Sequence, residues 1–349
     1  MLLKVKLILV LFTLSFLFGC EMGNGFQNGN SENATQENHK NYNDNSGTTS
    51  TEISEKYDTL GVYDVKRYPE QGLTDEYVVY APEEDSINAD IPVVLFLVGG
   101  NSHVSSYPGV MQFLASKGYY VIGSDHGGSY SSYETYSVFL SALYAARNKY
   151  HLSLNKIVVM GHSQGGGQAF YVMKRIQDKG FGSEASLVLS IDGWFTFSMN
   201  QNDLRALHGE IAFLQMNGLI GTGTDPRIHL TIWNLANKTD RKFLILPENK
   251  HSYVASSLDN LLNNKKDILY IIGALTDDTF MGKTAGYESI PEENKSSYDA
   301  INNALKPKNT YHSGDCYGND YNARNGQLKY YNINYCTPEE YKEISTDVR

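Results

Sequence analysis

The pentapeptide GHSQG at residues 161–165 places Ser163 in the pattern G-x-S-x-G. An apolar, β-branched run at 157–160 precedes it, and residues 168–177 after it have the pattern of a helix. In the order strand, tight turn, helix, the glycines let the backbone turn sharply and leave the serine hydroxyl clear of the sheet at a helix N-terminus. A serine held in this way can attack a carbonyl carbon, so we expect Ser163 to be a nucleophile.

A serine hydroxyl is a weak nucleophile at neutral pH and needs a base within hydrogen-bond reach, and the base needs an orienting carboxylate. After a turn of this kind the acid and then the histidine follow the serine along the chain. His251 lies in a loop directly after an apolar, strand-like run, where such a base is expected. The other histidines after the serine precede a strand, fall inside an expected helix or lie in the polar C-terminal segment: His208, His229 and His312.

Two aspartates compete for the role of the orienting acid. Asp192 directly follows the apolar run 185–191, a position where an aspartate has no obvious capping role. Asp225 follows the loop after the next strand, but it directly precedes Pro226, which is the arrangement of a helix N-cap with proline at the first helical position. The sequence favours Asp192, and Asp225 is the alternative.

Acyl chemistry at a serine also needs two N–H donors aimed at the developing oxyanion. One donor is expected from the backbone of Gln164, the residue after the nucleophile. The other is expected from the turn after the apolar run 92–98, with Gly100 as the first choice and Asn101 as the second. Trp194 follows the favoured acid, where it either forms a wall of the substrate pocket or packs in the core.

Apolar strands alternate with amphipathic helices from residue 77 to residue 275. Continuous apolar runs bounded by turn residues indicate strands that are buried on both faces, as in parallel sheets. The alternation therefore predicts an α/β protein with a mostly parallel, doubly wound sheet. The expected strands cover 77–80, 92–98, 119–123, 157–160, 185–191, 211–216 and 243–246, and the expected helices cover 110–117, 136–150, 168–177, 226–236, 254–262 and 268–275.

The first residues have the composition of a targeting segment. Lys4 and Lys6 precede an uncharged apolar run of 12 residues, 7–18, which is short for a membrane span and typical of a signal peptide. The end of this segment, LFGC at residues 17–20, resembles the lipobox of bacterial lipoproteins. The resemblance implies that cleavage before Cys20 leaves this cysteine to be lipidated. An ordinary secretory peptide with an incidental cysteine is the alternative. The residues that follow, to 55, are rich in Asn, Gly, Ser and Thr, and we expect a flexible tether.

The chain has three cysteines and a net charge of −10, which bear on its cellular compartment and on its possible partners. If Cys20 carries lipid, Cys316 and Cys336 form an even pair in an oxidising compartment, and we expect a disulfide between them. The sequence has no His/Cys spacing typical of zinc, and we expect no metal and no cofactor. It also has no basic block, so we expect neither nucleic acid nor an anionic membrane surface as a main partner.

The composition shifts divide the chain into four expected parts. A lipoprotein signal peptide covers 1–19, and the tether covers 20–55. The catalytic α/β domain covers 56–285, and a polar, disulfide-pinned C-terminal extension covers 286–349.

From about residue 77 to residue 275 the chain resembles a serine esterase of the α/β-hydrolase superfamily, and GHSQGG at 161–166 carries most of the resemblance. The segment LSIDGW at 189–194, with His251 downstream, is similar to the platelet-activating-factor acetylhydrolase and chlorophyllase branch, in which the acid follows the strand after the elbow. The glycine pair at 99–100 and Trp194 are also similar to the cutinase and polyester-hydrolase branch, in which the acid lies near Asp225. The C-terminal extension and the long loop at 218–224 depart from both branches, so the resemblance leaves the substrate open.

Together these features predict a lipoprotein of the bacterial cell envelope that hydrolyses carboxylic esters through a Ser-His-Asp triad and an acyl-enzyme. We expect an ester of a lipid or a polyester as substrate, and a monomer that meets the membrane only through its lipid anchor and faces the periplasm or the exterior. Two alternatives keep the fold: an acyltransferase that uses the same triad, and a non-catalytic surface binding lipoprotein. The intact elbow and His251 argue against the binding protein, which needs neither.

Overall fold

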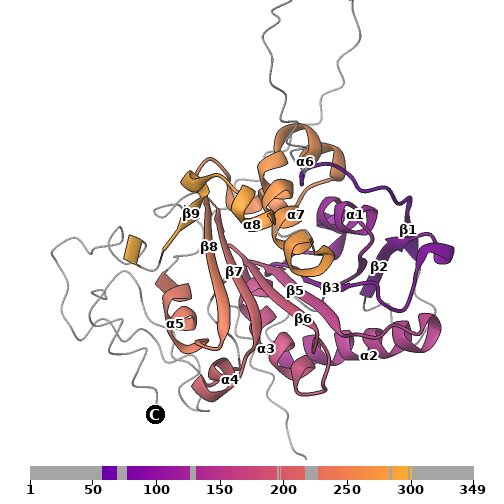
Figure 1. Ribbon diagram of the computed structural model, residues 1–349, viewed down its shortest axis with the longest axis horizontal. Coiled ribbons are helices and arrows are strands. Elements are labelled where there is room, and N and C mark those ends of the chain that lie inside the picture. Colours follow the sequence, from indigo (N-terminus) through magenta and orange to yellow (C-terminus); the bar gives the residue numbers. More distant parts are fainter. Residues whose placement is uncertain are drawn as a thin grey trace, which may run out of the picture. The chain divides into compact units, whose positions relative to one another are not determined.

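The computed structural model describes most of the chain between residues 57 and 300 (Figure 1). The described residues are 57–68, 77–125, 131–194, 196, 198–216, 227–282, 285–297 and 299–300. The expected signal peptide, Cys20, the tether and the Cys316–Cys336 disulfide lie outside the described residues, and so does Asp225.

One mixed sheet of nine strands organises the described part of the chain (Figure 1). Its strands are β1 (Val65–Tyr68), β2 (Tyr77–Pro82), β3 (Val93–Leu97), β4 (Tyr120–Ser124), β5 (Lys156–His162), β6 (Ala185–Ile191), β7 (Gly209–Met216), β8 (Thr239–Leu246) and β9 (Lys295–Ser296). They lie in the order β1-β2-β4-β3-β5-β6-β7-β8-β9. The strands from β3 to β8 are parallel, whereas the pairs β1–β2, β2–β4 and β8–β9 are antiparallel. The sheet is therefore mostly parallel, as the sequence predicts.

Helices cover both faces of this sheet. The helices are α1 (Pro108–Ser116), α2 (Ser132–Tyr150), α3 (Gln164–Gln177), α4 (Gln201–Arg205), α5 (Arg227–Leu235), α6 (Leu258–Asn264), α7 (Lys266–Met281) and α8 (Gly286–Ser289). Short 3-10 turns are η1 (Glu84–Ser86), η2 (Val104–Ser106), η4 (His251–Val254) and η5 (Glu292–Asn294). Helices α2 to α5 share one apolar core with the sheet, and α1 and α6 to α8 share the other (Figure 1).

Alternation along the central strands builds both cores. In β3, Val93, Leu95 and Leu97 face the helices α2 to α5, whereas Val94 and Phe96 face the opposite layer. All five side chains are buried, because successive residues of a strand point to opposite faces and both faces are covered. This explains why the sequence of the strand is continuously apolar rather than alternating.

The order of the strands creates a crevice at the centre of the sheet. β3 and β5 are parallel neighbours, with Leu97 paired to Gly161, so their carboxyl ends lie at the same edge. β3 leads to α1 on one face, whereas β5 leads to α3 on the other. In open α/β sheets, ligands bind where neighbouring strands diverge in this way. The turn at 99–100 and Ser163 both lie at this point.

Two element boundaries near the expected site differ from the sequence-based expectation. α3 begins at Gln164 instead of residue 168, so it includes the glycines at 165–167 in spite of their low helix propensity; Gly165 and Gly166 are packed too closely against neighbouring backbone to carry a side chain. The helix expected over 254–262 is split. His251–Val254 forms η4, and Ser257 caps α6 by accepting a hydrogen bond from the Asn260 N–H at 3.3 Å.

Several short elements are absent from the sequence-based expectation. They are β1, α4, α8 and β9, each six residues or shorter. Residues 286–296, which the sequence assigns to the C-terminal extension, pack on the sheet through α8 and β9. Among the described residues, no helix combines the length and the apolar composition that a bilayer crossing requires.

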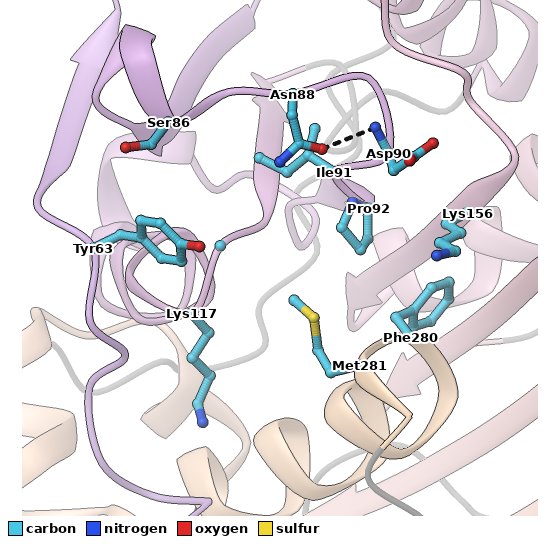
Figure 2. Close-up of a pocket in the computed structure, with 11 residues that line it drawn as sticks. Tyr63, Ser86, Asn88, Asp90, Ile91, Pro92, Lys117, Lys156, Phe280 and Met281 are labelled. Carbon is cyan, nitrogen blue, oxygen red and sulfur yellow. Dashed lines mark hydrogen bonds between the residues drawn. The ribbon is translucent and has the colours of Figure 1, made fainter.

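A pocket opens at the amino ends of the parallel strands, the edge opposite to Ser163 (Figure 2). Pro92 directly precedes β3, Lys156 begins β5 and Lys117 follows α1, so strand starts form its floor. Phe280 and Met281, at the end of α7, form an apolar wall. No residue that lines this pocket belongs to the expected catalytic set.

Candidate active site

Ser163 lies at the sharp turn between β5 and α3. Its backbone has φ +54° and ψ −120°, a conformation that costs a non-glycine residue on the order of 1–3 kcal/mol. Three backbone hydrogen bonds hold the turn. The Ser163 N–H donates to the Ile191 carbonyl at 2.9 Å, and the Ser163 carbonyl accepts from Gly167 at 3.2 Å and from Trp194 at 2.9 Å. The strained serine is therefore fixed by the end of β6, by the loop that follows β6 and by its own helix.

Close packing explains the glycines around the serine. A Cβ on Gly161 would lie 2.3 Å from the backbone oxygen of Gly165, and a Cβ on Gly166 would lie 2.8 Å from the Cα of Gly193. Neither site admits a side chain, because optimal contacts between carbon atoms are about 3.5–4.0 Å. The start of α3 therefore packs directly, through Gly166, against Gly193 in the loop that carries Asp192.

The structure brings Asp192 and His251 together. His251 Nδ1 contacts Asp192 Oδ2, and the aspartate is fully buried at the end of β6. The other carboxylate oxygen, Oδ1, accepts from Gln215 Nε2 at 2.6 Å and from the Met216 N–H at 3.2 Å. Asp192 also has a positive φ of 47°. Two donors on Oδ1 therefore hold a strained, buried carboxylate so that Oδ2 faces the imidazole.

Gln215 is a residue that sequence reasoning misses. It lies inside the apolar run of β7, is 1% exposed, and donates to a carboxylate 23 positions earlier in the chain. A polar residue near the end of a buried, apolar strand needs a polar partner, and this is the one available signal in the sequence.

The contact with Asp192 determines the tautomer of His251. A carboxylate can only accept, so His251 Nδ1 carries the proton and Nε2 is the basic nitrogen. The His251 side chain is 34% exposed, whereas the carboxylate that orients it is fully buried. Behind the histidine, Asn249 Nδ2 contacts Asp267 Oδ2 and holds the loop against α7.

The expected oxyanion donors lie beside the serine. Gln164 begins α3, and a Cβ placed on Gly100 would lie 2.6 Å from Gln164 Oε1, so the two residues are in direct contact. The Gly99 N–H donates to the hydroxyl of Tyr107 at 3.2 Å, whereas no described residue accepts the N–H of Gly100. Of the glycine pair, Gly100 is therefore the one whose N–H has no acceptor among the described residues. Asn101, the second choice, has a φ of +57° in the same turn.

The other residues that the sequence suggests for the site differ in their burial. Trp194 is 39% exposed, so its side chain lies at the surface beside the elbow rather than in the core. His208 is exposed before β7, and His229 is fully buried in α5. His312 and the alternative acid Asp225 lie outside the described residues. Within the part of the chain that the structure describes, no cluster of His, Cys, Asp and Glu could hold a metal ion.

Two buried histidines have pKa values far below the ordinary value of 6.5. Burial lowers the pKa of His162 to about 3, with a further contribution from neighbouring His251. Burial also lowers the pKa of His229 to about 4, and the nearby backbone of Gly193 offsets this only in part. The His229 ring lies among aromatic side chains, 4.7 Å from the ring of Phe213 and 6.0 Å from that of Phe243, between centroids. Both rings are therefore neutral at physiological pH.

These two histidines make the fold less stable in mild acid. Between about pH 4 and 6.5 the unfolded chain binds protons at both rings and the folded chain does not, so stability falls as the pH falls. Each ring adds a slope of up to about 1.4 kcal/mol per pH unit. Urea denaturation at several pH values in this window measures the slope. His229→Gln should reduce it by about half, and a matched change at exposed His208 should not. A stability that is independent of pH in this window would contradict the assignment.

One comparison with known proteins matches the part of the chain that contains the serine elbow. Residues 92–179 match the family model described as the alpha/beta hydrolase fold. The match runs from the start of β3 to the end of α3, so it includes the glycine turn and the serine elbow but neither Asp192 nor His251. A search of curated proteins gave no match to the chain. The family match and the mostly parallel sheet support the α/β-hydrolase superfamily and a hydrolase-type function.

Proposed function

We propose that this chain is a serine hydrolase that acts on carboxylic esters through Ser163, His251 and Asp192. The contact between His251 Nδ1 and the buried carboxylate of Asp192 carries the proposal. It orients a histidine whose ring centroid lies 4.4 Å from that of His162, the residue before a serine with a strained backbone at the turn between β5 and α3.

The reaction proceeds in two halves. Ser163 Oγ attacks the acyl carbon while His251 Nε2 takes the hydroxyl proton, and the backbone N–H groups of Gln164 and Gly100 stabilise the tetrahedral oxyanion. The C–O bond to the leaving alcohol then breaks, and His251 gives the alcohol its proton. Water attacks the resulting acyl-enzyme by the same route, which releases the acid and restores the serine. Trp194, exposed next to the elbow, offers an apolar surface to the ester, in keeping with a lipid or polyester substrate.

Labelling with a fluorophosphonate probe tests the proposal. The probe reacts with an activated serine, so we expect a covalent adduct on the peptide that contains Ser163, together with hydrolysis of p-nitrophenyl esters. A binding protein without catalysis would give neither result. An acyltransferase would label as well, but added alcohol or amine acceptors would then capture most of the acyl group in place of water.

A further inference from the structure

Three hydrogen bonds in series join the glycine turn to the backbone of His251. The Gly99 N–H lies 3.2 Å from Tyr107 Oη, which lies 2.9 Å from His162 Nδ1. On the other side of the ring, His162 Nε2 lies 2.8 Å from the carbonyl oxygen of His251. The four residues come from the turn after β3, the N-cap of α1, the last position of β5 and the first position of η4.

The chemistry of the last acceptor fixes the direction of the whole series. A backbone carbonyl only accepts, so His162 Nε2 carries the proton. In the neutral ring Nδ1 is then an acceptor, and it takes the hydroxyl proton of Tyr107. The tyrosine oxygen in turn accepts from Gly99. Every member therefore donates toward His251, and the series needs a neutral His162.

Burial makes these bonds effective. Tyr107 is 0% exposed and His162 is 4% exposed, so water does not compete for the bonds. The burial also lowers the pKa of His162 to about 3, which keeps the ring neutral over the range in which a serine hydrolase works. A charged ring here would repel the imidazolium that His251 becomes during the reaction, because the two ring centroids are only 4.4 Å apart.

This series of hydrogen bonds lies next to the glycine turn, Ser163 and His251, but it does not involve the atoms that react. His162 directly precedes Ser163, and a Cβ on Gly99 would lie 3.1 Å from His162 Nδ1 and 3.3 Å from the Cβ of Ser163. Tyr107 holds the turn that presents Gly100, and His162 holds the backbone of the base. Small displacements among these parts are costly, because acyl transfer depends on sub-ångström alignment.

We propose that Tyr107 and His162 are positioning residues, which set the distance between the oxyanion turn and the catalytic base for the reaction at Ser163. The inference rests on the proposed function, but the state of the ring can be measured independently of activity.

Nitrogen NMR of the full chain with ¹⁵N-labelled histidine tests the tautomer. We expect a protonated, pyrrole-type Nε2 and an unprotonated, pyridine-type Nδ1 for His162 throughout the neutral pH range, assigned by the loss of its signals in His162→Leu or, if that variant does not fold, in His162→Gln. Tyr107→Phe should shift the Nδ1 signal, because it removes the donor to that nitrogen. The proposal fails if Nδ1 carries the proton or if Tyr107→Phe leaves its resonance unchanged.

Steady-state kinetics of ester hydrolysis test the role in positioning. Tyr107→Phe should lower kcat about tenfold with little change in KM, and His162→Leu should lower it further, since both loosen alignment in the transition state. The double variant should be within about twofold of His162→Leu, because the two residues act as one unit. His162→Gln, which can still donate to the His251 carbonyl, should recover part of the loss.

Tyr119→Phe is the matched control. Tyr119 is also fully buried, and its hydroxyl bonds Asp277 at 3.3 Å on α7, away from the serine elbow. Its removal should leave kcat unchanged. Unchanged kcat in Tyr107→Phe, or losses that multiply in the double variant, would overturn the positioning role. If the wild type and Ser163→Ala hydrolyse esters equally, the proposed function fails, while the NMR result still decides whether the series exists.

Discussion

Replacing Ser163 by alanine is expected to lower kcat for ester hydrolysis by a factor on the order of 10⁵–10⁶. The reaction needs an oxygen that bonds to the acyl carbon and gives its proton to His251, and alanine supplies no such atom. The residual rate comes from the oxyanion donors and substrate binding alone.

Loss of structure cannot account for such a change in Ser163→Ala. Every hydrogen bond that holds the elbow uses the backbone of Ser163, through Ile191, Gly167 and Trp194, and alanine keeps all three. The positive φ is equally strained for either residue. The variant should therefore unfold at the same urea concentration as the wild type.

Ser252→Ala is the matched control for this measurement. Ser252 is an exposed serine directly beside His251, so it tests whether any nearby hydroxyl can act. Its replacement should leave p-nitrophenyl ester hydrolysis and fluorophosphonate labelling unchanged. If Ser163→Ala keeps more than a few per cent of the wild-type rate, after subtraction of spontaneous hydrolysis, another group performs the chemistry and the proposed function is wrong.

The sequence predicts the central strands well, because their burial leaves a local trace. β3 is apolar throughout and β5 is apolar over residues 157–160, since both of their faces are covered, and turn residues mark their ends. Strands at the edges of the sheet lack such continuous apolar runs. β1 and β9 are only partly buried and short, and they are strands only because β2 and β8 lie beside them.

Contacts between distant segments explain what the sequence does not reveal about the site. His162 occupies a variable position of the G-x-S-x-G pattern, and its partners lie 55 residues earlier and 89 residues later. Gln215 is likewise recognised only through Asp192. The glycines at 165–167 argue locally against a helix, but at 165 and 166 glycine is needed because a side chain would collide with the end of β3 or with Gly193. In each case packing between elements overrides the local preference.

Replacing Asp192 by asparagine is expected to lower kcat about 10⁴-fold, because it reverses the tautomer of His251. Gln215 Nε2 and the Met216 N–H both donate to Oδ1 of the present carboxylate. They would hold the amide oxygen of asparagine in the same place, so the amide NH₂ would face His251 Nδ1. A donor at that position makes Nδ1 the acceptor and moves the histidine proton to Nε2, which then cannot take the proton of Ser163.

Asp225→Asn is the comparison that decides between the two candidate acids. If Asp192 orients the base, Asp225→Asn should keep the wild-type rate of both ester hydrolysis and fluorophosphonate labelling, while Asp192→Asn loses both. Asp192→Asn should also fold, since asparagine matches aspartate in size and keeps both bonds to Oδ1. The opposite pattern, with activity lost in Asp225→Asn and kept in Asp192→Asn, would assign the acid to Asp225. The buried contact of Asp192 with His251 would then be a structural one, and the substrates to screen first would be polyesters, as in the cutinase-like branch.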